Sequence, residues 1–164
     1  MTLAAQAVVV LRGTGLTVAT AESLTGGLVT AALVDVPGSS RVLRGGIVAY
    51  APDVKARLVG VDEELLAAGG PVQAEVACQL ALGAARALGA DCGLGTTGVA
   101  GPGAADGHPA GTVFVAASRA GTVRVRGLLL AGTRAAVRRA AADAALALLL
   151  GLLADGEQAG GWRC

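Results

Sequence analysis

Residues 37–55 read PGSSRVLRGGIVAYAPDVK and set out the helix–strand–helix order on which the fold depends. Pro37-Gly38 marks the end of a helix, because proline cannot continue one and glycine favours the turn that follows. The apolar run 46–50 predicts a strand, and Pro52 suits the first turn of a new helix that carries Lys55. A strand held between two helices is typical of an α/β architecture.

The same segment holds three groups suited to nucleophilic chemistry: the hydroxyl of Ser40, the phenol of Tyr50 and the amine of Lys55. A serine is a weak nucleophile until a base takes its proton, and a lysine is such a base only when its pKa falls toward the working pH. A helix start and burial both lower the pKa of a lysine, whereas a carboxylate as close as Asp53 opposes this. The segment therefore predicts a nucleophilic site with Lys55 as the base.

A purely structural interpretation of these residues stays open. Ser39 or Ser40 would then cap a turn, Tyr50 would end a strand against the core, and Lys55 would be solvated. The spacing of these residues is compatible with both interpretations, so composition and motifs elsewhere in the chain are needed to choose between them.

The composition predicts one domain with a core of small side chains. The chain has 164 residues, of which 54% are apolar but only 2% aromatic, so Ala, Val and Leu must build the core. A formal net charge of +1 argues against a nucleic-acid partner and against an acidic membrane surface. The three cysteines show no CxxC spacing, which predicts neither a zinc site nor a disulfide framework.

The sequence shows no segment for membrane insertion or export. Its most apolar run, 144–154, is too short to span a bilayer, and its start lacks the basic residues and the cleavage site of a signal peptide. Reduced cysteines are then the default, so we expect a cytoplasmic protein. The sequence leaves the assembly state open, a homo-oligomer included.

Turn residues divide the chain into alternating helical and β-rich segments. Residues 155–164 are polar and glycine-rich and predict a loose tail, which leaves one domain over 1–154. The order of elements predicts an α/β sandwich whose mixed, largely parallel sheet is covered by helices on both faces. The expected helices are 2–12, 28–36, 52–60, 62–68, 73–88 and 132–153, and the expected strands are 16–21, 46–50, 92–97, 112–118 and 122–130.

A turn rich in Ser, Thr and Gly, residues 22–27, joins the first strand to its helix. A strand, such a turn and a helix form the local shape of an anion site, because free N–H groups point outward at a helix start. The alternative is an ordinary N-cap by Ser23 or Thr25. Glu22, at the strand end, would either hydrogen-bond a sugar hydroxyl or tie down the turn.

Two further turns next to strands hold candidate binding residues. Residues 98–103, GVAGPG, form a glycine-rich loop where open α/β sheets bind ligands, although the loop is neither a P-loop nor a dinucleotide motif and a flexible turn is the alternative. Arg134 opens the last helix, where the helix dipole disfavours a cation unless an anion such as a phosphate joins it. The alternative is a surface arginine like Arg138 and Arg139. We assign no role to His108, the only histidine.

Six short motifs occur in one order between residues 16 and 150: AESLTGG (21–27), VPGSS (36–40), GIVAY (46–50) followed by Lys55, LVGV (58–61), TGVAGPG (97–103) and PAGTV (109–113). Each motif alone is weak, but the ordered series resembles the CinA C-terminal domain family, whose enzymatic members are nicotinamide-nucleotide amidases of the PncC type. The resemblance implies a three-layer α/β/α sandwich. It also implies hydrolysis of nicotinamide mononucleotide to nicotinate mononucleotide and ammonia, a reaction of NAD salvage, without metal or cofactor.

The resemblance also implies roles for single residues. Ser40 matches the proposed nucleophile, Tyr50 and Lys55 match the pair that activates it, and Thr97 matches the hydroxyl residue before the glycine loop. The residues that we expect to bind the nucleotide are Glu22, Ser23, Thr25, Gly26, Gly27, Ser39, Gly98, Gly101 and, for its phosphate, Arg134.

The sequence departs from the family's pattern at four places. Leu24 replaces the usual cysteine, Ala51-Pro52 stands where Ser-Asn is usual, Gln73 replaces a serine that would cap a helix, and Thr133 sits where Asp is common. Activities of the long N-terminal domain of full CinA proteins are not expected here. The departures favour, as an alternative, a nucleotide-binding module without turnover in a competence or damage-related pathway.

Overall fold

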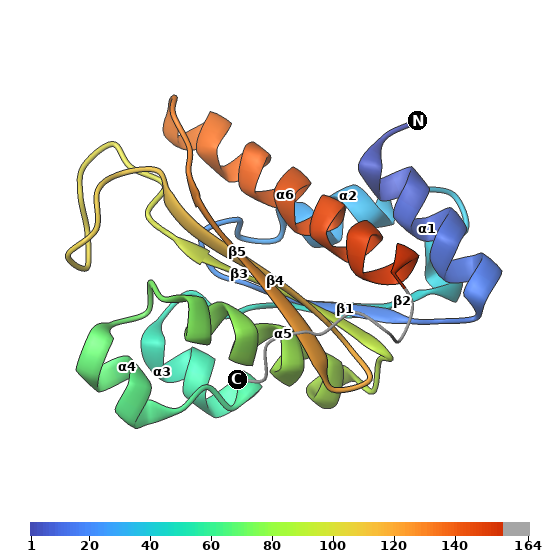
Figure 1. Ribbon diagram of the computed structural model, residues 1–164, viewed down its shortest axis with the longest axis horizontal. Coiled ribbons are helices and arrows are strands. Elements are labelled where there is room, and N and C mark those ends of the chain that lie inside the picture. Colours follow the sequence, from blue (N-terminus) through green and yellow to red (C-terminus); the bar gives the residue numbers. More distant parts are fainter. Residues whose placement is uncertain (156–164) are drawn as a thin grey trace.

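The computed structural model describes residues 1–155 and has three layers, with a five-stranded sheet between two sets of helices (Figure 1). The predicted α/β/α sandwich is therefore confirmed. The tail predicted over 155–164 lies outside the described residues, apart from Asp155. Within the described part of the chain, no helix has both the length and the apolar character needed to cross a membrane.

The sheet is mixed and largely parallel, as predicted. Its strands are β1 (Val18–Glu22), β2 (Leu43–Val48), β3 (Cys92–Gly98), β4 (Thr112–Arg119) and β5 (Thr122–Leu129), in the order β2-β1-β3-β4-β5. β1 pairs in parallel with β2 and β3, whereas β4 pairs antiparallel with β3 and with β5. β4 therefore runs against the direction that the other strands share.

Helices cover both faces of this sheet. One face carries α1 (Leu3–Thr14), α2 (Leu28–Val34) and α6 (Arg134–Ala154), and the opposite face carries α3 (Pro52–Val54), α4 (Glu63–Gly69) and α5 (Ala74–Leu88) (Figure 1). A 3₁₀ turn, η1 (Ser39–Arg41), precedes β2, and a π-helical turn, η2 (Lys55–Val59), continues α3. Each predicted helix and strand is present.

Helix starts follow the capping residues that the sequence supplies. The side chains of Thr2, Asp62 and Thr133 accept hydrogen bonds from backbone N–H groups in the first turns of α1, α4 and α6. Pro52 is the first residue of α3, where its missing N–H costs nothing. Gln73 precedes α5 without a side-chain cap, as the loss of a serine there predicts.

Glycines allow α5 to lie against the backbone of β3. A Cβ atom at Gly93 would overlap the carbonyl oxygen of Ala81, and one at Gly95 would overlap that of Ala77 and lie 2.7 Å from the Ala81 nitrogen. The glycines of CGLGTT therefore serve the close backbone approach that the sequence predicts. No side chain fits at either position without moving α5 away from the sheet.

We expect Gly95→Ala to destabilise the fold by roughly 1–3 kcal/mol, because the added methyl group meets backbone atoms that cannot rotate away. Urea unfolding followed by circular dichroism measures the change. Gly13→Ala is the matched control, since this glycine lies in α1 with open space around its Cβ position and should gain roughly 0.5–1 kcal/mol. Equal unfolding midpoints for Gly95→Ala and wild type would contradict the packing argument.

β2 begins and ends earlier than the predicted strand, 46–50. Its register pairs Leu43 with Val18 and Val48 with Glu22, because the length of β1 decides which residues of this edge strand are hydrogen-bonded. Tyr50 thereby lies outside the sheet, in the segment that leads into α3. Ser40 therefore precedes β2, whereas Tyr50 and Lys55 follow it, so the whole strand lies between them.

Candidate active site

A pocket of about 290 Å³ lies where the chain leaves β1 and β3. The chain passes from β1 to β2 on one side and returns to β3 on the other, so the strand order changes direction here. Open α/β sheets bind ligands in such a crevice. The pocket is lined by Ser23, Leu24, Tyr50, Lys55, Pro71, Val72, residues 97–106 and Arg134.

Lys55 is a buried amine in the wall of this pocket, with 1% of its surface exposed. Its Nζ donates a hydrogen bond to the Tyr50 carbonyl oxygen at 2.8 Å. Burial lowers the pKa of Lys55 from 10.5 to about 8, against the opposing effect of the Asp106 carboxylate. The solvated alternative is therefore wrong, and part of the population carries a neutral amine near neutral pH.

Asp106, rather than Asp53, is the acid that acts on Lys55. Asp106 lies in the loop between β3 and β4 and lines the pocket, whereas Asp53 is exposed and does not line it. The sequence interpretation missed Asp106 because its proximity to Lys55 arises only from the fold. The one available signal was an acidic residue in the loop that leaves the strand.

Arg134 joins two walls of the pocket. Its guanidinium donates to the Gly101 carbonyl oxygen at 2.8 Å and to the Tyr50 hydroxyl at 3.0 Å. Tyr50 is 60% exposed, so it does not end a strand against the core, and Arg134 is not a free surface arginine. A guanidinium at the positive end of α6 suits an anionic group of a ligand.

The structure does not bring Ser40 to this pocket. Ser40 lies in η1, before β2, whereas Tyr50 and Lys55 follow it. The 6 residues of β2 between them span about 20 Å at roughly 3.3 Å per residue, farther than a lysine side chain reaches. The predicted Ser40–Lys55 pair is corrected on this ground. Ser39, predicted to bind substrate, is also remote and donates to the Val34 carbonyl oxygen at 3.4 Å.

Glu22 ties down the start of α2 and does not face the pocket. Its buried carboxylate accepts hydrogen bonds from the backbone N–H groups of Gly27 at 2.9 Å, Val29 at 3.1 Å and Thr30 at 2.8 Å. These N–H groups at the start of α2 are the donors predicted to bind an anion of the ligand. The Glu22 carboxylate therefore occupies the predicted anion site itself. The substrate-binding roles of Glu22 and Gly27 are corrected accordingly.

Most of the 23–27 turn is scaffold. The buried Thr25 hydroxyl shares a hydrogen bond with that of Thr96 at 2.7 Å, and the Gly26 N–H donates to the Ser23 carbonyl oxygen at 3.0 Å. Neither Thr25 nor Gly26 lines the pocket, which corrects their predicted role in substrate binding. Leu24 belongs to the core cluster and also lines the pocket.

Ser23 is the hydroxyl that shares the pocket with Lys55. It follows β1 directly, and its backbone N–H donates to the Thr96 carbonyl oxygen at 3.0 Å. Its side chain lines the pocket with 8% of the residue exposed. Among residues 1–155, no group forms a hydrogen bond with its hydroxyl. A serine at the end of an inner parallel strand was the signal that could have identified it.

Thr97 supports the pocket wall through a hydrogen bond of its own. Its hydroxyl donates to the Pro71 carbonyl oxygen at 2.6 Å, so in the ligand-free protein its proton is directed to the wall. Its catalytic role stays a prediction. The bond attaches the 71–72 segment to β3, and both line the pocket. Gly98 and Gly101, which are predicted to bind the nucleotide, also line the pocket.

Comparison with known proteins gives close matches over nearly all of the chain. Residues 1–153 match the family model described as the CinA C-terminal domain. The CinA-like protein of Frankia casuarinae is 49% identical over 139 residues, which are 84% of this chain and 32% of the relative. The CinA-like protein of Gemmatimonas aurantiaca is 45% identical over 150 residues, 90% of this chain and 35% of the relative. The chain thus spans about a third of the length of the curated relatives that it matches.

Solved structures of similar fold also match. The competence damage-inducible protein A of Klebsiella pneumoniae is 32% identical, with a TM-score of 0.90 over 94% of this chain and 97% of that chain. The competence/damage inducible protein CihA of Agrobacterium tumefaciens is 36% identical, with a TM-score of 0.87 over 92% and 93% of the two chains. The similarity therefore covers the whole sandwich and includes the strands and loops that line the pocket.

Proposed function

This chain belongs to the CinA C-terminal domain family, and on that premise we propose that it is an amidase that hydrolyses nicotinamide mononucleotide to nicotinate mononucleotide and ammonia. One observation carries the proposal: a buried lysine with a pKa of about 8, a serine hydroxyl unpaired within the described chain, and an arginine at a helix start face one pocket. Attack on the amide of a phosphorylated ligand requires such a base, nucleophile and anion-binding group.

Ser23 is the nucleophile of the proposed reaction, in place of Ser40. The neutral Lys55 amine takes the proton of Ser23 Oγ while Oγ forms a bond to the carboxamide carbon. The carbon–nitrogen bond then breaks, and the Lys55 ammonium returns the proton to the leaving nitrogen, which departs as ammonia. Water hydrolyses the remaining ester of Ser23, with Lys55 again as the base, and releases the carboxylate.

Backbone N–H groups are the donors that the proposed oxyanion needs. Among the described residues, the N–H groups of Leu24, Ala100 and Gly101 have no acceptor, and all three residues line the pocket. A donor that is free in the resting protein and fixed in direction stabilises charge as it develops. Leu24 follows the nucleophile directly, so its N–H lies on the peptide that joins the two residues.

Arg134 is the group that we assign to the phosphate. Its guanidinium lies at the start of α6, so the ligand would meet both a cation and the positive end of a helix. The charged residues of the wall are Lys55, Arg134 and Asp106, which favour an anionic ligand while Lys55 is protonated. A volume of about 290 Å³ lies just below the roughly 300–1,000 Å³ that is usual for small-molecule pockets.

The direct test is to incubate the purified protein with nicotinamide mononucleotide and to measure ammonia together with nicotinate mononucleotide. We expect both products in equal amounts. Nicotinamide riboside, which has the same carboxamide but no phosphate, should react with a lower kcat/KM if Arg134 binds the phosphate. Absence of ammonia above the uncatalysed rate would contradict the proposal.

A nucleotide-binding module without turnover is the competing function. It predicts that nicotinamide mononucleotide raises the unfolding midpoint without releasing ammonia, because a ligand that binds only the folded state stabilises that state. The free hydroxyl of Ser23 and the lowered pKa of Lys55 favour the amidase, since a binding module needs neither.

A further inference from the structure

Arg138 holds the turn that carries Ser23. It lies one helical turn after Arg134 on α6, and its guanidinium donates through Nε to the Leu24 carbonyl oxygen at 2.8 Å. A second nitrogen of the same guanidinium donates to the Thr25 carbonyl oxygen, also at 2.8 Å. The interpretation of Arg138 as a surface arginine is wrong, because its side chain is half-buried and reaches from α6 to the turn that follows β1.

The turn is shaped to receive this guanidinium. Gly26 has a φ of 58°, a left-handed conformation that suits glycine, and a Cβ atom there would lie 3.1 Å from the nearer Arg138 nitrogen. Two successive carbonyl groups facing one planar fork form a two-point contact that a lysine cannot reproduce. Apart from Arg138, the Leu24 carbonyl has no donor within the described chain.

Ser23 is therefore fixed from two sides. Its own N–H is bonded to the Thr96 carbonyl at the end of the sheet, and Arg138 holds the Leu24–Thr25 and Thr25–Gly26 peptide groups, which begin one residue after it. The Ser23–Leu24 peptide, which carries the Leu24 N–H, is held by the Gly26 N–H that donates to the Ser23 carbonyl oxygen. Because each peptide group is planar, only the φ and ψ of Leu24 remain between this peptide and the one that Arg138 holds. A misplacement of about 1 Å at a reacting group costs roughly 10²-fold in rate.

We propose that Arg138 is a positioning residue, which sets the direction of the Ser23 hydroxyl and of the Leu24 N–H through the turn that it holds. The proposal rests on the amidase function proposed above. It also gives α6 a double role, because Arg134 and Arg138 lie on one side of the helix at positions i and i+4. Arg134 holds the Gly101 loop and Tyr50, and Arg138 holds the turn that carries Ser23.

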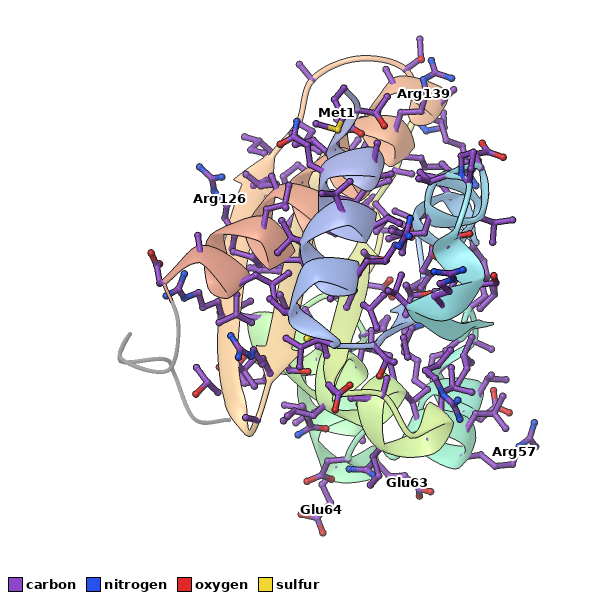
Figure 2. All side chains as sticks on the ribbon, turned by 90° about the vertical axis from the view of Figure 1, so that its right-hand side faces the viewer. Met1, Arg57, Glu63, Glu64, Arg126 and Arg139 are labelled. Carbon is purple, nitrogen blue, oxygen red and sulfur yellow. The ribbon has the colours of Figure 1, made fainter. Side chains whose placement is uncertain are left out.

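The test compares Arg138→Met, Arg138→Lys and the control Arg139→Met, all assayed well below their unfolding midpoints. Arg139 is exposed on the same helix and points away from the fold (Figure 2). We expect Arg138→Met to lower kcat by roughly 10–100-fold with KM within about two-fold of wild type, because binding groups stay in place while the nucleophile does not. Arg138→Lys should restore part of kcat, and Arg139→Met should match wild type.

Hydrogen exchange of the backbone amides of residues 24–28 gives a second readout that needs no turnover. Exchange should quicken in Arg138→Met and stay unchanged in Arg139→Met. Wild-type kcat in Arg138→Met, or unchanged exchange in this segment, would overturn the proposal. If wild type released no ammonia at all, the proposed function would fall, and the exchange rates alone would decide whether Arg138 orders the turn.

Discussion

Ser23→Ala is expected to lower kcat for ammonia release from nicotinamide mononucleotide by at least about 10³-fold, because the reaction then has no nucleophile. KM should change little, since the phosphate contact proposed for Arg134 would remain. Stability should stay within about 0.5 kcal/mol of wild type, because the hydroxyl has no hydrogen-bond partner in the described chain to lose. Steady-state kinetics and urea unfolding of the same preparation measure both quantities.

Ser40→Ala is the matched control for this experiment. Ser40 is exposed in η1 at the other end of β2, so its variant should keep kcat within about two-fold of wild type. The reverse result, with Ser40→Ala inactive and Ser23→Ala active, would show that the chemistry does not take place in the pocket of Lys55. Equal activity of both variants would mean that neither hydroxyl attacks the amide.

The layers and most element boundaries could be predicted from the sequence because local features decide them. Thr2, Asp62 and Thr133 cap the helices that follow them, and Pro52 starts one. The glycines of CGLGTT indicated a close approach to another backbone before α5 was known to be the partner. The limits of β2 were less predictable, because pairing with β1 decides them.

The site was harder to predict because its contacts join distant parts of the chain. Ser40 and Lys55 are close in sequence, yet the whole of β2 separates them, and this strand is longer than a lysine side chain can reach. Arg138 and Leu24 are 114 residues apart, so no local pattern relates them. Lys55 was a candidate for a lowered pKa because a lysine in the first turn of a helix meets the positive end of the helix dipole, but its burial arises only from the fold.

Lys55→Met should separate activity from stability. Methionine has a similar length and flexibility, so it fills the same space without the amine. We expect kcat to fall by about 10²–10⁴-fold, which is the usual contribution of a general base. The folded state should become more stable at neutral pH, because the buried amine resists the charge that it carries in the unfolded chain. A variant that is both active and less stable than wild type would contradict the role of Lys55.

The pH dependence of the wild-type rate tests the same amine without a substitution. The base must be neutral, so kcat/KM, which reports groups of the ligand-free enzyme, should rise with pH and level off above the Lys55 pKa of about 8, instead of rising to the ordinary value of 10.5. Stability should also rise between these two values, because only the unfolded state still binds the proton there.

Asp106→Asn tests whether the rise of the rate with pH, the ascending limb of the profile, reports the titration of Lys55. Three other titratable or charged side chains line the pocket with Lys55, namely Tyr50, Asp106 and Arg134, and Asp106 is the one that raises the pKa of Lys55. Its removal should move the limb to lower pH, whereas Asp53→Asn, on the exposed side of α3, should leave it in place. A limb unmoved by Asp106→Asn would assign the titration to another group. A limb moved to higher pH would contradict the electrostatic argument, because the loss of a carboxylate cannot stabilise a nearby ammonium.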